Sequence, residues 1–277
     1  MTTFFADYDG VLCDLDGVVY AGSQPIDAAI STLNTLMAQG VPVAFITNNA
    51  SKSANEVAQR LGSMGLKANP EHVMTSAQAV VELLSVKYDR NAGPVLVTGS
   101  SQLIKQVQAA GFTVTETAAD RPQVVVQGYN PKLQWDDLAQ ASFAIQNGAG
   151  WLASNLDLTI PLAGGIAPGN GSMVQAVGQA TGTQPEVAAG KPAPVMFQKM
   201  ANFFAMHRPL VVGDRLDTDI LGASNAGYDA ALVETGIHSR NDVSKFHELV
   251  TPEWVLPNLG ILLDEPLDAY RGRDEPF

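Results

Sequence analysis

Short runs of apolar and β-branched residues alternate with helical patterns along almost the whole chain. This alternation is typical of a parallel sheet flanked by helices, because each parallel connection has to cross a face of the sheet. The strands are expected at 11–13, 43–46, 95–97, 123–127 and 210–213, and the helices at 28–39, 53–64, 101–110, 172–180, 194–204 and 217–226. We therefore predict an α/β fold with a Rossmann-like parallel-sheet core.

The composition narrows the class of protein. Of 277 residues, 46% are hydrophobic, which is enough for the core of one or two domains. The net charge of -12 would repel phosphate backbones and anionic lipid, so nucleic acid and membrane are not expected as partners. The single cysteine, Cys13, and the lack of a signal peptide or a long apolar run predict a cytoplasmic protein. Residues 264–277 are expected to form a surface tail.

The first chemical motif is Asp14-Leu-Asp-Gly-Val-Val-Tyr20, directly after the first strand. Open α/β sheets build their sites at the carboxyl ends of strands, where Asp14 would lie. Asp16 returns to the same side, so the pair offers a carboxylate nucleophile and a carboxylic acid for a two-step ester hydrolysis. A solvated acidic turn is the alternative. The similar run Asp7-Tyr-Asp-Gly10 is followed by another strand, and we assign it no role.

Two further motifs follow later strands. Thr47-Asn-Asn49 offers a hydroxyl and amides that bind phosphoryl oxygens without adding charge, although such residues are also common in turns. Gly190-Lys-Pro192 places a lysine where it could neutralise a phosphoryl group. Prolines at 185 and 192 break the spacing of a phosphate-binding P-loop, so Lys191 is not part of one.

The last motif is Gly213-Asp-Arg-Leu-Asp-Thr-Asp219. Asp214 would lie at a strand end and Asp219 in the first turn of the next helix, and clustered carboxylates of this kind suit Mg²⁺. Asp217 is better explained as an acidic residue at a helix N-terminus. The four motifs together place acidic, hydroxyl and lysine side chains at one edge of one sheet.

These motifs resemble those of the haloacid dehalogenase superfamily of phosphatases, in the branch of p-nitrophenylphosphatase-like and phosphoglycolate or glycerol-phosphate phosphatases. The similarity runs from about 11 to 236. It implies Mg²⁺-dependent hydrolysis of a small phosphomonoester through a phospho-aspartate on Asp14, with Asp16 as general acid and then base. It implies phosphoryl binding by Thr47 and Lys191. The metal ligands that it implies are Asp14, Asp16, Asp214 and Asp219.

The resemblance also implies two domains. The segment between the second and third motifs resembles an α/β cap of class IIA, expected at 87–187, which leaves 1–86 and 188–277 as the catalytic core. A homodimer is implied as well. The residues expected to contact substrate are Thr47, Asn48, Asn49, Lys191, Asn155 and Asp157. For Asn155 and Asp157, turn structure is the alternative.

Two departures from the family pattern lie in the expected cap. Asn130 stands where the family often has Asp, and Trp135-Asp-Asp-Leu138 stands where it has a Tyr-x-Lys-Leu pattern. The substrate is therefore left open among sugar phosphates, glycerol phosphate, phosphoglycolate and similar compounds. Two other functions are left open too: a phosphotransferase or mutase with the same intermediate, and a non-catalytic phosphometabolite-binding protein.

Overall fold

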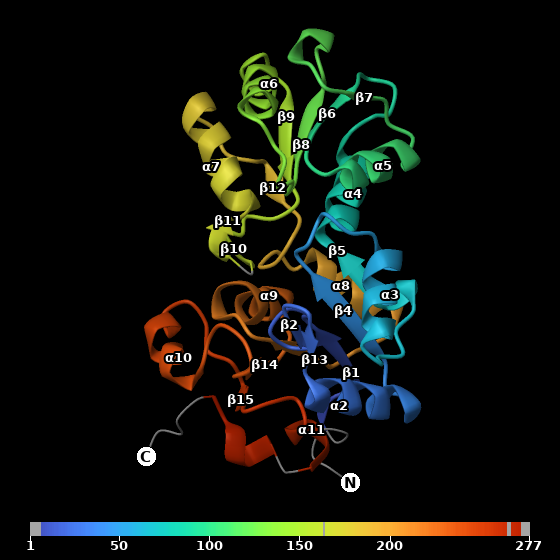
Figure 1. Ribbon diagram of the computed structural model, residues 1–277, viewed down its shortest axis with the longest axis vertical. Helices are drawn as coiled ribbons and strands as arrows, with labels where there is room; N and C mark the ends of the chain where they lie inside the picture. The colour runs from blue at the N-terminus through green and yellow to red at the C-terminus, as the bar shows by residue number, and fades with distance from the viewer. Residues whose placement is uncertain (1–6, 163, 265–266, 273–277) are drawn as a thin grey trace. The chain divides into compact units, whose positions relative to one another are not determined.

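Two parallel sheets, each in its own unit of the chain, form the fold (Figure 1). The computed structural model describes residues 7–162, 164–264 and 267–272. Unit 1 is made of residues 1–47, 54–74 and 191–277, and unit 2 of residues 48–53 and 75–190. The predicted α/β fold class, a parallel-sheet core with a second inserted α/β unit, is confirmed. No helix in the described ranges is long and apolar enough to span a bilayer.

The sheet of unit 1 has six strands in the order β15-β14-β13-β1-β4-β5. In chain order they are β1 (Gly10–Cys13), β4 (Val43–Thr47), β5 (Val73–Thr75), β13 (Pro209–Gly213), β14 (Ala230–Val233) and β15 (Trp254–Leu256). The strand β1 pairs in parallel with β13 and β4, so that Cys13 lies opposite Val212 on one side and Phe45 on the other. The residues that follow these three strands therefore emerge at the same edge of the sheet.

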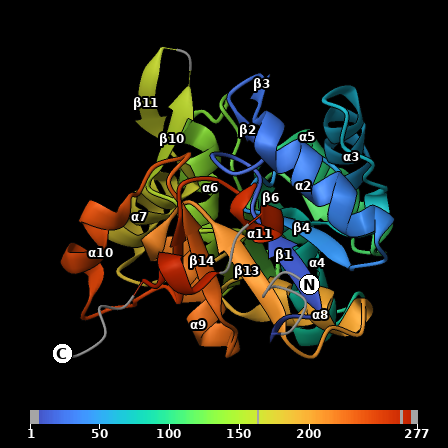
Figure 2. The same cartoon turned by 90° about the horizontal axis from the view of Figure 1, so that it is seen from below.

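Helices cover both faces of this sheet (Figure 2). They are α2 (Asp27–Ala38), α3 (Ala54–Ser63), α8 (Val195–Phe203), α9 (Leu221–Ala226), α10 (Arg240–Phe246) and α11 (Ile261–Asp264). Figure 2 shows α2 and α11 on one face and α8 and α9 on the other. Shorter elements are β2 (Tyr20–Ala21), β3 (Gln24–Pro25), η1 (Pro70–His72), η3 (Leu216–Ile220) and η4 (Leu267–Tyr270).

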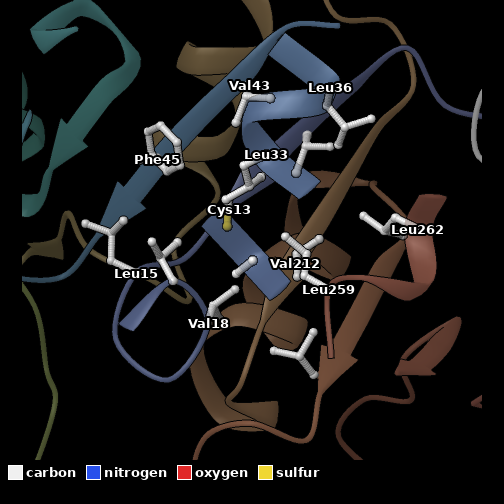
Figure 3. Packing of buried hydrophobic residues seen from close by; sticks show 14 of the residues in the cluster. Cys13, Leu15, Val18, Leu33, Leu36, Val43, Phe45, Val212, Leu259 and Leu262 are labelled. Atoms are coloured by element: carbon white, nitrogen blue, oxygen red, sulfur yellow. The ribbon is translucent and has the colours of Figure 1, made fainter. Parts of the chain in front are cut away.

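The core of unit 1 lies between β1, β4 and α2 (Figure 3). Leu33 and Leu36 are about one turn apart on α2, and both are fully buried against the sheet. They pack in one cluster with Cys13 of β1 and Phe45 of β4, each of which is 0% exposed. The alternation of side chains along β1 and β4 thus directs one apolar face of the sheet at the apolar stripe of α2.

Unit 2 has a five-stranded parallel sheet in the order β12-β9-β8-β6-β7. Its strands are β6 (Val95–Thr98), β7 (Val114–Thr115), β8 (Val124–Gln127), β9 (Gly150–Ala153) and β12 (Val187–Ala188). Its helices, in chain order, are α4 (Ser76–Lys87), α5 (Ser101–Ala109), η2 (Ala118–Asp120), α6 (Trp135–Gln146) and α7 (Asn170–Thr181). An antiparallel pair, β10 (Thr159–Leu162) and β11 (Gly165–Pro168), lies between β9 and α7 in the chain. The predicted cap range, 87–187, falls inside this unit, which also contains α4 and residues 48–53.

The end of the chain differs from the expected surface tail. Leu267 is only 2% exposed, and Arg271 pairs with Trp254 in an isolated bridge next to β15. The Arg271 guanidinium also lies 5.1 Å from the centre of the Trp254 ring. The prediction of a tail is therefore wrong for residues 267–272, because one buried leucine and one aromatic contact hold them against unit 1. Residues 265, 266 and 273–277 lie outside the described residues.

We predict that Leu33→Ala destabilises unit 1 by about 2–5 kcal/mol, since it removes a fully buried side chain and leaves a cavity. Urea unfolding followed by tryptophan fluorescence measures the change. Leu249→Ala is the matched control, because that leucine is 53% exposed in the same unit, and we expect it to change the stability by less than about 0.5 kcal/mol. Equal losses in the two variants would contradict the packing described for α2.

Candidate active site

The first residue of the site is Asp14, which directly follows the carboxyl end of β1. Its backbone N–H donates to the carbonyl of Val212, 2.8 Å away, which continues the pairing of β1 with β13 for one more residue. Its side chain is only 11% exposed. Gly17, at φ +83°, closes the turn that follows. A side-chain carbon at Gly17 would lie 2.3 Å from Asp214 Oδ2, so only glycine lets the first motif approach the last motif this closely.

Lys191 lies at the centre of the site and is 4% exposed. Its Nζ forms ion pairs with Asp14 Oδ1 and with Asp219 Oδ1, the second at 2.6 Å. The same Nζ donates to the carbonyl oxygen of Ile46, 3.3 Å away, at the end of β4. Thr47, the next residue, is 4% exposed. The structure thus gathers residues from the ends of β1, β4 and η3 around one buried ammonium group.

Three carboxylates form a cluster at the same place. Oxygens of Asp14, Asp214 and Asp219 all lie within 4.8 Å of one another. Asp214 Oδ2 accepts from the backbone N–H of Ile237 at 2.8 Å, and Asp219 Oδ2 accepts from that of Arg215 at 3.1 Å. Both aspartates are almost fully buried. A set of carboxylate oxygens, two of whose three carboxylates are held by backbone donors, fits a hard divalent cation such as Mg²⁺.

The charges of this cluster are mutually dependent. Burial raises the pKa of Asp14 well above its usual value, and the carboxylates of Asp219 and Asp214 add to the rise, while Lys191 opposes it. Burial, with repulsion from Asp219, raises the pKa of Asp214 to about 7. Burial disfavours the charged form of Lys191, but Asp14 and Asp219 raise its pKa overall. The lysine therefore stays charged. One ammonium group faces three carboxylates, so a bound cation would balance the excess negative charge.

Asp16 is exposed and lies beside two residues whose importance the sequence did not indicate. The Tyr20 hydroxyl donates to Asp16 Oδ2 at 3.3 Å, and the Arg60 guanidinium lies 3.9 Å from the centre of the Tyr20 ring. Partial desolvation raises the pKa of Asp16, and Arg60 and Tyr20 oppose the rise. A raised pKa favours the protonated form that a general acid needs. Tyr20 belongs to the first motif, but nothing near Arg60 in the sequence marks it.

The other predicted substrate contacts belong to unit 2. Asn48 donates through Nδ2 to both carboxylate oxygens of Asp157, at 2.9 and 3.1 Å. Asn155 donates to the carbonyl of Asn48 at 2.8 Å. The Oδ1 atom of Asn49 accepts from the backbone and the hydroxyl of Ser51, at 2.8 and 2.7 Å. The structure therefore brings Asn48, Asn155 and Asp157 together. The side chain of Asn49 instead stabilises a local turn with Ser51.

The two departures from the family pattern have local structural contacts. Asn130 donates to the carbonyl of Gly99 at 3.0 Å and accepts from the N–H of Lys132 at 2.9 Å. Asp137 accepts from the N–H of Gln134 at 2.7 Å, at the start of α6. Asn130 thus stabilises a turn, and Asp137 caps the start of α6, both within unit 2.

The acidic residues that we did not assign to the site also have structural contacts. Asp9, in the similar run, accepts from the N–H groups of His207 and Arg208 at 2.7 and 2.9 Å. Asp217 pairs with the Arg215 guanidinium at 2.6 Å and is partly exposed. Neither belongs to the three-carboxylate cluster found among the described residues.

Comparisons with known proteins agree with this geometry. Residues 11–113 match the haloacid dehalogenase-like hydrolases, and residues 188–262 match a related description, HAD-hydrolase-like. The D-glycerol 3-phosphate phosphatase of Mycobacterium tuberculosis is 42% identical over 92% of this chain and 71% of its own length. The acid sugar phosphatase of Staphylococcus saprophyticus is 32% identical over 94% of this chain and 98% of its own length.

Solved structures show the same similarity. The glycerol phosphate phosphatase of Mycobacterium tuberculosis in complex with magnesium has a TM-score of 0.89 and 39% identity, over 98% of this chain and 80% of that one. The 4-nitrophenylphosphatase of Thermotoga maritima has a TM-score of 0.84 and 29% identity, over 91% of this chain and 95% of that one.

The fold and the site thus define a hydrolase with an acidic, lysine-containing centre at the carboxyl edge of a parallel sheet. The chain belongs to the haloacid dehalogenase-like hydrolases. The predicted enzyme class, a phosphatase of small phosphomonoesters, is confirmed, as is the resemblance to p-nitrophenylphosphatase-type relatives.

The pKa of Asp214 leads to a prediction about metal and stability. The pKa of Asp214 is about 7 in the folded protein and about 4 in the unfolded chain. Between these two pH values the folded state holds a proton on Asp214 that the unfolded state has lost. Without metal, the contribution of Asp214 to stability therefore falls as the pH rises from about 4 to about 7. Mg²⁺ should offset this loss, so we expect it to raise the unfolding temperature more at about pH 8 than at about pH 5.5.

Thermal unfolding in Mg²⁺ and in EDTA measures both effects. Asp214→Asn should raise the unfolding temperature in EDTA and remove most of the Mg²⁺ response, because it deletes one charge from the cluster. Asp217→Asn is the matched control, since it removes the same charge from a partly exposed position outside the cluster, and it should keep the response. An undiminished response in Asp214→Asn would contradict the metal site.

Proposed function

We propose that this chain is a Mg²⁺-dependent phosphatase that uses Asp14 as its nucleophile and glycerol 3-phosphate as its substrate. The observation that carries the proposal is the contact of the buried Lys191 with both Asp14 and Asp219, beside the third carboxylate of Asp214. The ion pair with Lys191 holds the Asp14 carboxylate in place and balances part of its charge. The carboxylate can then approach the phosphorus atom of an anionic substrate.

The residues divide the reaction between them. Asp14 attacks the phosphoryl group and forms an acyl phosphate, while Lys191 and the Thr47 hydroxyl bind phosphoryl oxygens. Asp16, with its raised pKa, donates a proton to the leaving alcohol and then takes one from the water that hydrolyses the acyl phosphate. The residues that would hold the metal are Asp14, Asp16 through its carbonyl, Asp214 and Asp219. When bound, Mg²⁺ supplies positive charge that stabilises the phosphoryl oxygens.

Support for the substrate comes from the relatives. The curated relative with 42% identity is named for D-glycerol 3-phosphate, and the one with 32% identity is named for acid sugar phosphatase activity. We propose that unit 1 is the catalytic core and that unit 2 is a cap that selects the group attached to the phosphate. The buried, free Cys13 supports a reducing compartment, the cytoplasm. The homodimer implied by the resemblance stays a prediction.

A substrate panel tests the reaction and the substrate together. We expect phosphate release from glycerol 3-phosphate to exceed release from a hexose phosphate and from phosphoglycolate, and p-nitrophenyl phosphate should serve as an activated substrate. All release should require Mg²⁺ and stop in EDTA. No release from any compound by folded protein would contradict the proposal, and phosphate recovered on a second alcohol would indicate a phosphotransferase.

Asp14→Asn should lower kcat by at least about a thousandfold, because it removes the nucleophile from a group of residues that act together. The variant should still fold, because Lys191 keeps its ion pair with Asp219. Asp7→Asn is the control, because it makes the same change in the similar run and at an exposed residue. Trapping of acid-stable, base-labile ³²P on wild type but not on Asp14→Asn measures the intermediate directly. Retained turnover in Asp14→Asn would refute the assignment.

A further inference from the structure

A polar network in unit 2 holds Asn48 through both its side chain and its main chain. The side-chain amide donates to both oxygens of Asp157, and the carbonyl accepts from Asn155 at 2.8 Å and from the Ser76 hydroxyl at 2.7 Å. Asn155 is itself fixed, since its own carbonyl accepts from the buried Asn170 at 2.8 Å. The hydrogen bonds therefore fix the side chain of Asn48 and the peptide group that joins Asn48 to Asn49.

A second stretch of chain packs into this network. A side-chain carbon at Gly190 would lie 2.6 Å from Asn48 Oδ1, 2.7 Å from the Ser154 carbonyl and 2.9 Å from Asn155 Cβ. Position 190 therefore has to be glycine for the chain to lie this close. Within unit 2, Asn48 and Gly190 are thus held in contact by the same few residues.

The sequence neighbours of these two residues are the phosphoryl binders of the proposed function. Thr47 precedes Asn48 by one peptide bond, and Lys191 follows Gly190 by one peptide bond. Both Thr47 and Lys191 belong to unit 1, so the chain passes between the units at 47–48 and at 190–191. Consecutive Cα atoms are held about 3.8 Å apart by the peptide bond, so fixing Asn48 limits the positions open to the Cα of Thr47.

We propose that Asp157 and Asn155 are positioning residues that hold Asn48, and through it the Thr47 hydroxyl, in place for phosphoryl binding. This inference rests on the proposed function. It replaces the role of substrate contacts that the sequence suggested for these two residues, because their polar atoms already bond to Asn48 and its neighbours. A residue that positions a phosphoryl binder acts equally on every phosphomonoester, whereas a contact to the leaving group acts on one.

Two substrates that share only the phosphoryl group distinguish these roles. We expect Asp157→Ala to lower kcat/KM by the same factor, about 10- to 100-fold, for glycerol 3-phosphate and for p-nitrophenyl phosphate, since a displacement of about 1 Å can cost that much. Inhibition by inorganic phosphate should weaken as well. Asp157→Asn keeps one acceptor for Asn48 and should recover most of the loss. Asp136→Ala, a change at an exposed residue of the same unit, is the matched control and should leave both substrates unaffected.

Hydrogen exchange gives a readout that does not need turnover. In Asp157→Ala the backbone amides of residues 47–49 should exchange faster than in wild type, and in Asp136→Ala they should not. Unchanged exchange, unchanged kcat/KM, or a loss confined to glycerol 3-phosphate would each overturn the inference. Absence of phosphate release by wild type would instead count against the proposed function, while the exchange comparison still decides whether Asp157 holds this loop.

Discussion

The buried ion pairs of Lys191 are the interaction on which the rest of the site depends. An ammonium group that is 4% exposed loses most of its hydration, and only close opposite charges make that tolerable. Asp14 and Asp219 supply those charges. The dependence is mutual, because without the lysine the same carboxylates would repel one another and take up protons. The lysine therefore fixes both the geometry and the ionisation of the site.

The parallel sheet explains how residues so far apart in the sequence come to share this lysine. The strands β1, β4 and β13 are neighbours, and each ends at the edge where the site lies. The residues that follow them therefore need no long loops to meet, and backbone N–H groups hold two of the three carboxylates, those of Asp214 and Asp219. For Asp219 the donor is the N–H of Arg215, within the same short stretch that leads into η3.

Much of this could be predicted from the sequence, because the signals are local. A few consecutive residues are enough to recognise a strand that is followed by Asp, Thr or Gly-Asp. The spacing of apolar residues also predicts the bounds of α2 and β4 to within about one residue of those in the structure. Helix α4 was not predicted, since six of its twelve residues are buried and its apolar residues do not form one stripe. β14 is rich in alanine and has no strong strand pattern of its own.

Contacts between distant residues explain the remaining differences. Asn48 and Asp157 are 109 positions apart, and no pattern in either segment indicates that they bond to each other. The start of α7 was predicted two residues late, because Asn170 and Gly171 read as loop residues. In the structure Asn170 is buried, and its amide serves Asn155. The residues that we propose carry the chemistry were thus visible in the sequence, whereas the hydrogen bonds that Asn48, Asn155 and Asp157 make with one another were not.

Cys13 has a consequence for how this enzyme withstands damage. It is the one cysteine of the chain, it is 0% exposed, and burial raises the pKa of its thiol well above the usual value. Its Sγ donates to the carbonyl of Asp14 at 3.0 Å, so it lies next to the proposed nucleophile. Oxidants and alkylating reagents attack exposed thiolates. With a carboxylate as the proposed nucleophile and the sole thiol protonated and covered, the centre offers such reagents no sulfur to modify.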